Sequence, residues 1–373
     1  MAGNDPTSGA AQGRADPQSG QDPAQSRAAP VARFLDPSGQ ALKPLPDFAG
    51  DRAALVAMYT AMVTTRAFDA KAIALQRTGR LGTYASSLGQ EAVAVGTACA
   101  MRAEDVFLPS FREHGAQLVR GVTLDELFLY WGGDERGNDY QGPRRDFPVC
   151  IPVASQFPHA AGVALAMVQK GEAGVAVAVG GDGATSKGDF YEAMNLVGAW
   201  RLPAVFVINN NQWAISVRRR DQTAAQTLAQ KAVAAGIPGV QVDGNDVIAV
   251  RDAVGHALAR ARAGGGGALI ECQSYRLGDH TTADDARRYR DDEEVRPHWK
   301  EDPVARLRTH LTEAQGWTKD EEEALLHDAR AEVEAAAERY IATGPAPARA
   351  MFESLFADMP EDLKAQAKDA GHG

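Results

Sequence analysis

The stretch of sequence that decides the fold is VAVAVGGDGATSKGDFYEAMNLVGAWRLPAVFVINNNQW, residues 175–213. The apolar runs at 175–180 and 202–208 predict two buried strands, and the amphipathic segment between them predicts a helix. A parallel βαβ unit of this kind places the turns after both strands at the same edge of the sheet. Asp182 and Asn211 lie in these turns, so we expect them side by side where open α/β sheets usually bind ligands.

The residues of these two turns suit a magnesium ion beside a phosphate group. Asp182 offers a carboxylate, Asn211 an amide oxygen and Trp213 a backbone carbonyl, and Mg²⁺ prefers hard oxygen ligands of this kind. Glycines beside the aspartate allow a tight turn and a close approach of the backbone to a ligand. The amides that follow are expected to open a helix whose positive end favours anions. The phosphate-binding candidates of this turn are Gly181, Gly183 and Ala184.

Taken singly, each part of this pattern is ordinary. A Gly-Asp-Gly sequence is common in turns, and asparagines in a loop usually reflect turn chemistry. The pair becomes specific because each member follows an apolar strand. The chain has neither the GxxxxGK[ST] pattern nor a GxGxxG at a strand–helix junction, so the two usual nucleotide-binding fingerprints are not predicted.

Composition indicates a globular protein from a reducing compartment. Of 373 residues, 45% are hydrophobic and 24% are charged, as in ordinary globular domains. A formal net charge of −10 argues against nucleic-acid binding, and no window approaches the roughly 18 apolar residues of a membrane span. The three cysteines, Cys99, Cys150 and Cys272, are far apart and lack metal-ligand spacing.

We predict a doubly wound α/β fold, in which a mostly parallel sheet has helices on both faces and helical extensions at the N- and C-termini. The expected divisions are a disordered tail at 1–30, an extended arm at 31–50, the α/β domain at 51–300 and a helical extension at 301–373. The tail lacks the apolar core of a secretion signal and carries acids that mitochondrial presequences avoid, so we expect a bacterial cytoplasmic location. Further strands are predicted at 240–242 and 268–274, and helices at 51–77, 90–102, 116–120, 123–131, 152–170, 221–235, 246–263 and 319–342.

Gly181-Asp182-Gly183 together with Asn210-Asn211 resembles the thiamine diphosphate motif, and residues 33–365 resemble the alpha subunits of 2-oxo acid dehydrogenases. The segments that carry the likeness are GRLGTYASSLGQEA at 79–92, GDFYEAMNLVGAW at 188–200, AQKAVAAGIPGVQVDG at 229–244 and GDHTTADDARRYR at 278–290. The last two, with MFESLF at 351–356, are most similar to the acetyl-transferring pyruvate dehydrogenases of the two-subunit bacterial type.

The resemblance implies a ligand set for both the metal ion and the cofactor. Mg²⁺ would be held by Asp182, Asn211 and the Trp213 carbonyl. These three residues would also border the thiamine diphosphate. The other residues implied to contact it are Phe111, Arg112, Ile151, Val153, Gly181, Gly183, Ala184, Asn209 and His280.

Phe111 and Arg112 stand where the resembled family has a Tyr-Arg pair that touches the diphosphate. The phenylalanine lacks the hydroxyl for one hydrogen bond, while the arginine keeps the charge. An arginine is also expected on physical grounds, because a magnesium ion and one carboxylate leave a diphosphate underneutralised. The alternative for Arg112 is an ion pair with Glu113 or Asp105.

His280 matches the active-site histidine of the family, on a polar loop at 276–292. Its acidic neighbours at 279, 284 and 285 are expected to raise its pKa. Thr281 stands where some relatives carry a regulatory serine. The only obvious anchor of the loop is the ligand, so we expect protease sensitivity without cofactor and protection with it.

The resemblance implies thiamine diphosphate-dependent oxidative decarboxylation of pyruvate, with the acetyl group passed to the lipoyl group of a dihydrolipoyl acyltransferase core. The chain has one phosphate-holding module and no second one to supply the carboxylate that activates the cofactor. We therefore expect it to act only with a beta subunit, as an α₂β₂ heterotetramer. The small-residue helix at 152–168 suits either a subunit contact or burial inside the chain.

Three other readings remain open. The substrate could be a branched-chain 2-oxo acid or acetoin instead of pyruvate, or the chain could be a noncatalytic binding module that keeps the fold. A metal-dependent phosphohydrolase would need a second carboxylate close to Asp182. Asp189 is expected to point elsewhere, since it lies seven residues on, at helical spacing.

Overall fold

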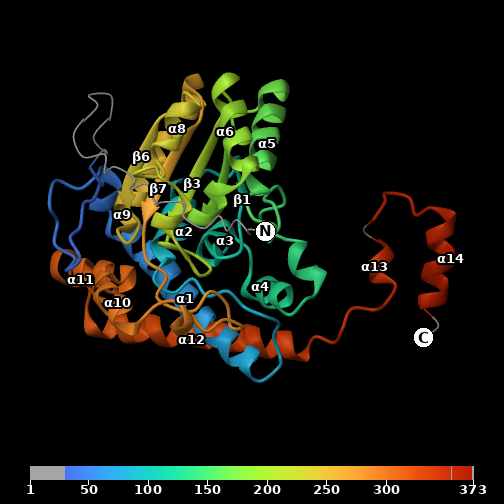
Figure 1. Cartoon of the computed structure of the whole chain (residues 1–373). Coiled ribbons are helices and arrows are strands. Elements are labelled where there is room, and N and C mark those ends of the chain that lie inside the picture. The colour runs from blue at the N-terminus through green and yellow to red at the C-terminus, as the bar shows by residue number, and fades with distance from the viewer. Residues whose placement is uncertain (1–29, 354, 372–373) are drawn as a thin grey trace, which may run out of the picture.

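The computed structural model describes residues 30–353 and 355–371, and its centre is a five-stranded parallel sheet (Figure 1). The strand order is β1-β2-β3-β7-β6, and every neighbouring pair is parallel. The strands are β1 (Val106–Leu108), β2 (Ala176–Gly181), β3 (Ala204–Asn210), β6 (Gly239–Asp243) and β7 (Ala268–Gln273). The carboxyl ends of all five strands therefore lie at one edge.

Helices cover both faces of this sheet, because side chains alternate along each buried strand. Phe206 and Ile208 of β3 face one hydrophobic layer, while Val205 and Val207 face the other. The first layer is formed by α5 (Gln156–Lys170) and α6 (Gly188–Ala199), and the second by α2 (Glu91–Ala100), α3 (His114–Arg120) and α9 (Val247–Arg260). The predicted doubly wound fold is confirmed.

The order of connections places a crevice at the carboxyl edge. The chain steps from β2 to β3 through α6, and it steps in the opposite direction from β6 to β7 through α9. Strands β3 and β7 are therefore neighbours that belong to oppositely directed connections. Ligands of open α/β sheets bind at such a switch point.

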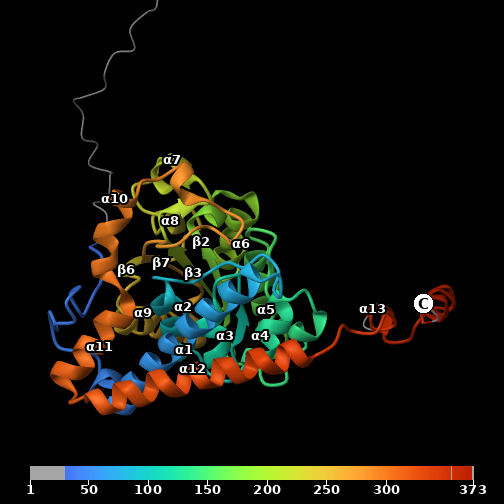
Figure 2. The ribbon, with the colours of Figure 1, turned by 90° about the horizontal axis from the view of Figure 1, so that it is seen from below.

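The two ends of the chain wrap one side of this core. Helix α12 (Lys319–Ala342) runs along α1 (Arg52–Arg77) and α4 (Leu124–Trp131), as Figure 2 shows, and α11 (Pro303–Ala314) packs on α1. The arm before α1 runs beside β6, where Ala32 bridges Val242. Helices α13 (Ala350–Glu353) and α14 (Glu361–Ala370) project away from the main body (Figures 1 and 2).

Among the described residues, no helix combines the length and hydrophobicity that a membrane span requires. Several short elements complete this part of the chain. The predicted tail at 1–30 lies, except for its last residue, outside the described residues. The short elements are β4 (Trp213–Ala214), β5 (Val217–Arg218), α7 (Arg219–Gln222), α8 (Lys231–Ala234), α10 (Asp292–Val295), η1 (Asp47–Gly50), η2 (Glu135–Asn138), η3 (Asp182–Ser186), η4 (Ala261–Gly265), η5 (Ala286–Arg288) and η6 (Arg296–Glu301).

Some predicted elements were wrong or misplaced. The helix predicted at 221–235 is two short helices separated by irregular chain, because local side chains satisfy the backbone instead: Thr227 Oγ1 accepts from the amide of Gln230, whose Oε1 accepts from the amide of Gln226. The helix predicted at 152–170 starts only at Gln156. Strand β1 was missed because three residues carry too little periodicity.

Candidate functional site

A cavity of about 930 Å³ opens at the carboxyl edge of the sheet, within the size range of small-molecule sites. Its walls come from the segments that follow β1, β2, β3 and β7. Residues between 83 and 90, residues 151–155 before α5 and Gln156 at the start of α5 complete them. The structure brings all twelve predicted residues to this cavity: Phe111, Arg112, Ile151, Val153, Gly181, Asp182, Gly183, Ala184, Asn209, Asn211, Trp213 and His280.

Asp182 is placed at the cavity by strand β2, which ends one residue before it. Burial raises the pKa of its carboxyl to about 6, although Gln222 Nε2 donates to its Oδ2 over 2.6 Å. Thr185 steadies the turn by donating from Oγ1 to the Asp182 carbonyl at 2.8 Å. The carboxylate is thus held in a defined direction by a neighbouring amide, as the carboxylate ligands of metal sites usually are.

Strand β3 brings Asn211 to the same cavity, because β2 and β3 pair in register with Gly181 opposite Asn209. The Nδ2 of Asn211 donates to Gln90 Oε1 at 2.7 Å, and its Oδ1 accepts from the Trp213 amide at 3.1 Å. The two side chains expected to share a metal ion therefore stand at the ends of paired strands.

The third expected ligand, the Trp213 carbonyl, accepts from Nη1 of Arg276 at 3.3 Å. A carbonyl oxygen has two lone pairs, so one remains for a further partner. Arg276 is fully buried and also donates from Nη2 to the Ile215 carbonyl at 2.8 Å and to the Tyr289 hydroxyl at 2.7 Å. This arginine, which the sequence analysis missed, fixes the turn that carries the carbonyl.

The turn after β2 is tightly packed at Gly183 and open at Gly181. A Cβ at Gly183 would lie 2.7 Å from the Ala214 Cβ, so only glycine fits, and a Cβ at Gly181 would meet nothing within 4 Å. Lys231, also missed, reaches this turn from behind: its buried Nζ donates to the Thr185 carbonyl at 2.7 Å. The helix expected from Ala184 onward starts later than predicted, because η3 intervenes before α6.

Arg112 is buried at the cavity wall. Its Nη1 donates to the Ser86 carbonyl and its Nη2 to the His280 carbonyl, both at 2.5 Å. Within the described residues it makes no ion pair with either Glu113 or Asp105, so that alternative was wrong. Burial lowers its pKa to about 10, with a further contribution from Arg276. A buried cation without a carboxylate partner suits an anionic ligand.

His280 is held between two arginines. Its Nδ1 lies 2.9 Å from Arg112 Nη2 and 3.5 Å from Arg276 Nη1. Since guanidinium groups only donate, Nδ1 accepts and the neutral ring carries its hydrogen on Nε2. Burial and the two arginines lower the pKa of His280 to about 4.

The expectation of a raised pKa was therefore wrong: Asp284 does raise the pKa of His280, but burial and the two arginines outweigh that contribution. Asp284 Oδ2 accepts from the backbone amide of His280 at 2.8 Å and also bonds the Tyr289 hydroxyl. Asp279 accepts from a backbone amide at 2.9 Å, and Asp285 pairs with Arg287. These carboxylates therefore bond to other groups of the loop, while Arg112 and Arg276 contact the His280 ring.

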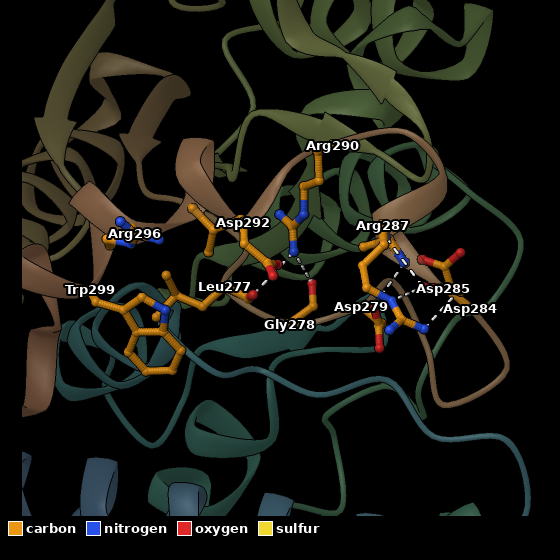
Figure 3. Close-up of a pocket in the computed structure, with 12 residues that line it drawn as sticks. Leu277, Gly278, Asp279, Asp284, Asp285, Arg287, Arg290, Asp292, Arg296 and Trp299 are labelled. Carbon is orange, nitrogen blue, oxygen red and sulfur yellow. Dashed lines mark hydrogen bonds and ion pairs between the residues drawn. The ribbon is translucent and has the colours of Figure 1, made fainter.

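Contacts within the chain anchor the loop at 276–292, so a ligand is not the only anchor of this loop. Arg290 is buried and donates to the successive carbonyls of Arg276, Leu277 (3.1 Å) and Gly278 (2.5 Å), as Figure 3 shows for the last two. The Thr282 amide donates to the Tyr84 carbonyl at 2.9 Å. Thr281 lines the cavity.

The mouth of the cavity carries exposed apolar side chains and strained backbone. Ile151 (52% exposed), Val153 (49%) and Ile215 (55%) all line it. Ile215 and Ala154, which both line the cavity, have positive φ angles of 56° and 77°. Such conformations cost of order 1–3 kcal/mol each and cluster at functional sites.

A second carboxylate does reach the cavity, contrary to expectation. Asp189, at the start of α6, lines the same space as Asp182. Within the described residues, however, no group of three or more His, Cys, Asp or Glu side chains could hold a metal ion. The oxygen atoms available at the cavity are therefore mixed: carboxylates stand beside an amide and a backbone carbonyl.

An α/β domain with a cofactor-sized cavity and these oxygen donors at its switch point defines a class of cofactor-binding proteins. The chain belongs to the dehydrogenase E1 component family, whose model matches residues 59–347. It is 40% identical over 339 residues to the pyruvate dehydrogenase E1 component subunit alpha of Staphylococcus aureus, covering 90% of this chain and 91% of that protein. The protein of the same name from Staphylococcus epidermidis is 39% identical over 340 residues, with the same coverage.

Proposed function

We propose that this chain is the alpha subunit of a pyruvate dehydrogenase. With a beta subunit it performs the thiamine diphosphate-dependent oxidative decarboxylation of pyruvate and the reductive acetylation of a lipoyl group on a dihydrolipoyl acyltransferase. The observation that carries this proposal is the pair Asp182 and Asn211, which end neighbouring strands and line one cavity. The names of the relatives support pyruvate as the substrate.

The residues present fit both thiamine diphosphate and Mg²⁺. Asp182, Asn211 and the free lone pair of the Trp213 carbonyl are hard oxygen donors for the metal ion. Gly181 leaves open space where a diphosphate could approach the backbone, and the buried Arg112 and Lys231 add positive charge. Asn209 completes the polar wall, and Ala184, Ile151 and Val153 line the apolar one.

The bound cofactor supplies the electron sink for decarboxylation, and the chain supplies binding and orientation. His280 acts as a neutral hydrogen-bond donor through Nε2, because Arg112 and Arg276 occupy its Nδ1 side. Once a beta subunit covers the mouth, Ile151 and Val153 would form an apolar wall that excludes water from the cavity. The exposed apolar mouth is the surface that the beta subunit would cover, forming an α₂β₂ heterotetramer.

The test is to purify the chain with and without its beta subunit and to compare pyruvate with 3-methyl-2-oxobutanoate. We expect pyruvate decarboxylation only in the assembly, only with thiamine diphosphate and a divalent metal ion, and lost in Asp182→Ala. Faster turnover of the branched substrate would assign the chain to a branched-chain enzyme. Decarboxylation by the chain alone would contradict the proposed division of the active site.

A further inference from the structure

Gln90 joins the two asparagines of the metal-binding turn through a single oxygen atom. It precedes α2, is 2% exposed and lines the cavity. Its Oε1 accepts from Asn209 Nδ2 at 3.1 Å and from Asn211 Nδ2 at 2.7 Å. Gln90, just before helix α2, thus bonds the end of strand β3, which lies 119 residues later in the sequence.

The opposite ends of both amides are fixed as well. Asn211 Oδ1 accepts from the Trp213 backbone amide at 3.1 Å, and Asn209 Oδ1 accepts from Ser274 Oγ at 2.6 Å. Turning over the Asn211 amide would set its oxygen against Gln90 Oε1 and its NH₂ against the Trp213 N–H. The network therefore permits only one orientation of each asparagine.

The same network fixes Gln90 and leaves it one free donor. Because two NH₂ groups point at its Oε1, its own amide cannot turn over. Its Nε2 is buried and has no hydrogen-bond partner among the described residues. Buried donors are rarely left unpaired in proteins, so this one points to a ligand at the cavity.

We propose that Gln90 is a positioning residue for the metal site, a role that rests on the proposed function. Its Oε1 holds the NH₂ of Asn211 away from the metal ion and so keeps Oδ1 available as a ligand. Its Nε2 donates to an oxygen of the bound diphosphate. Partners of metal ligands typically change metal affinity 10- to 100-fold when removed.

The test uses the full chain assembled with its beta subunit and saturated with thiamine diphosphate, and measures Mn²⁺ affinity by electron paramagnetic resonance. Gln90→Met, which deletes both amide atoms, should weaken Mn²⁺ binding about 10- to 100-fold. The matched control is Gln117→Met, since Gln117 is equally buried but donates to Tyr140 at 2.9 Å, outside the cavity. Its Mn²⁺ affinity should stay within about twofold of the unchanged chain.

A double-mutant cycle separates orientation from packing. The two oxygens of a carboxylate are alike, so in the Asn211→Asp background no orientation is needed. In that background, Gln90→Met should lower the Mn²⁺ affinity by less than about twofold. Equal losses in both backgrounds, or no loss in either, would overturn the proposal.

Two further results keep the proposal testable. If Gln90→Met does not assemble, Gln90→Glu keeps the acceptor oxygens for Asn211 but replaces the Nε2 donor with a carboxylate. It should therefore weaken thiamine diphosphate binding about tenfold or more, and an unchanged cofactor affinity would overturn the donor role. If the unchanged assembly binds no Mn²⁺ in the presence of thiamine diphosphate, the proposed function itself fails, and the positioning role with it.

Discussion

His280 stands between the guanidinium groups of Arg112 and Arg276, and this placement decides its protonation. Its pKa of about 4 lies below the ordinary value of 6.5, so the ring is neutral at neutral pH. As the pH falls from 6.5 towards 4, the unfolded chain binds this proton before the folded chain does. This group therefore lowers the free energy of unfolding in that window.

We predict that the His280 ring of the cofactor-free chain does not titrate between about pH 5.5 and 8. Nuclear magnetic resonance of histidine-labelled chain measures this directly. Arg112→Met should raise the pKa of His280, because it removes a nearby cation. Asp285→Asn should leave it unchanged, because that carboxylate pairs with Arg287. A ring that titrates near or above 6.5 would contradict the assigned tautomer.

Phe111 lines the cavity beside Arg112, with its ring centre 6.0 Å from that of His280. Phe111→Tyr should tighten thiamine diphosphate binding about 2- to 10-fold, the usual worth of one added hydrogen bond. Calorimetric titration of the assembled protein measures it. Phe111→Leu, which adds no hydroxyl, should show no gain. Equal affinities for the tyrosine variant and the unchanged chain would mean that the hydroxyl does not reach the diphosphate.

The sequence alone was enough to predict the candidate metal ligands, but not the residues that hold them in place. Asp182 and Asn211 could be predicted because each follows an apolar strand, and strand polarity puts them at one edge. Gln90 and Arg276 could not, since their contacts join segments 121 and 63 residues apart. One sequence does not reveal which distant segments meet.

At the scale of elements, the loop at 276–292 is held by Arg290, which donates to three successive carbonyls. Arg290→Met should make this loop of the cofactor-free chain about tenfold more susceptible to chymotrypsin, because those anchors are lost. Thiamine diphosphate with Mg²⁺ and the beta subunit should slow the cleavage. Arg287→Met is the control, since the Arg287 side chain is 79% exposed and, among the described residues, pairs only with Asp285. Equal cleavage of the two variants would contradict the anchoring role.

Helices and strands could be predicted where their hydrophobic pattern extends over enough residues. The apolar runs of β2 and β3, and the helices α1 and α12, lie close to their expected bounds. Residues 223–230 have helix-compatible composition, yet Thr227 and Gln230 bond to nearby backbone amides and keep this segment irregular. Tertiary contacts decide such segments, and they leave no periodic pattern.

At the scale of the whole molecule, the segment after residue 344 contributes little to the fold. Helices α13 and α14 project from the body (Figure 2). Of their described residues, only Ala367 is buried. Truncation after Gly344 should therefore change the thermal midpoint of the chain by less than about 2 °C. A fall of more than about 5 °C in differential scanning calorimetry would show that the segment packs on the core.

The central claim is that two neighbouring strand ends share one divalent ion. Anomalous diffraction from crystals of the assembled protein with thiamine diphosphate and Mn²⁺ tests it most directly. We predict one Mn²⁺ peak within about 2.0–2.3 Å of both Asp182 and Asn211 oxygens. A metal ion bound elsewhere, or held without either side chain, would contradict the account.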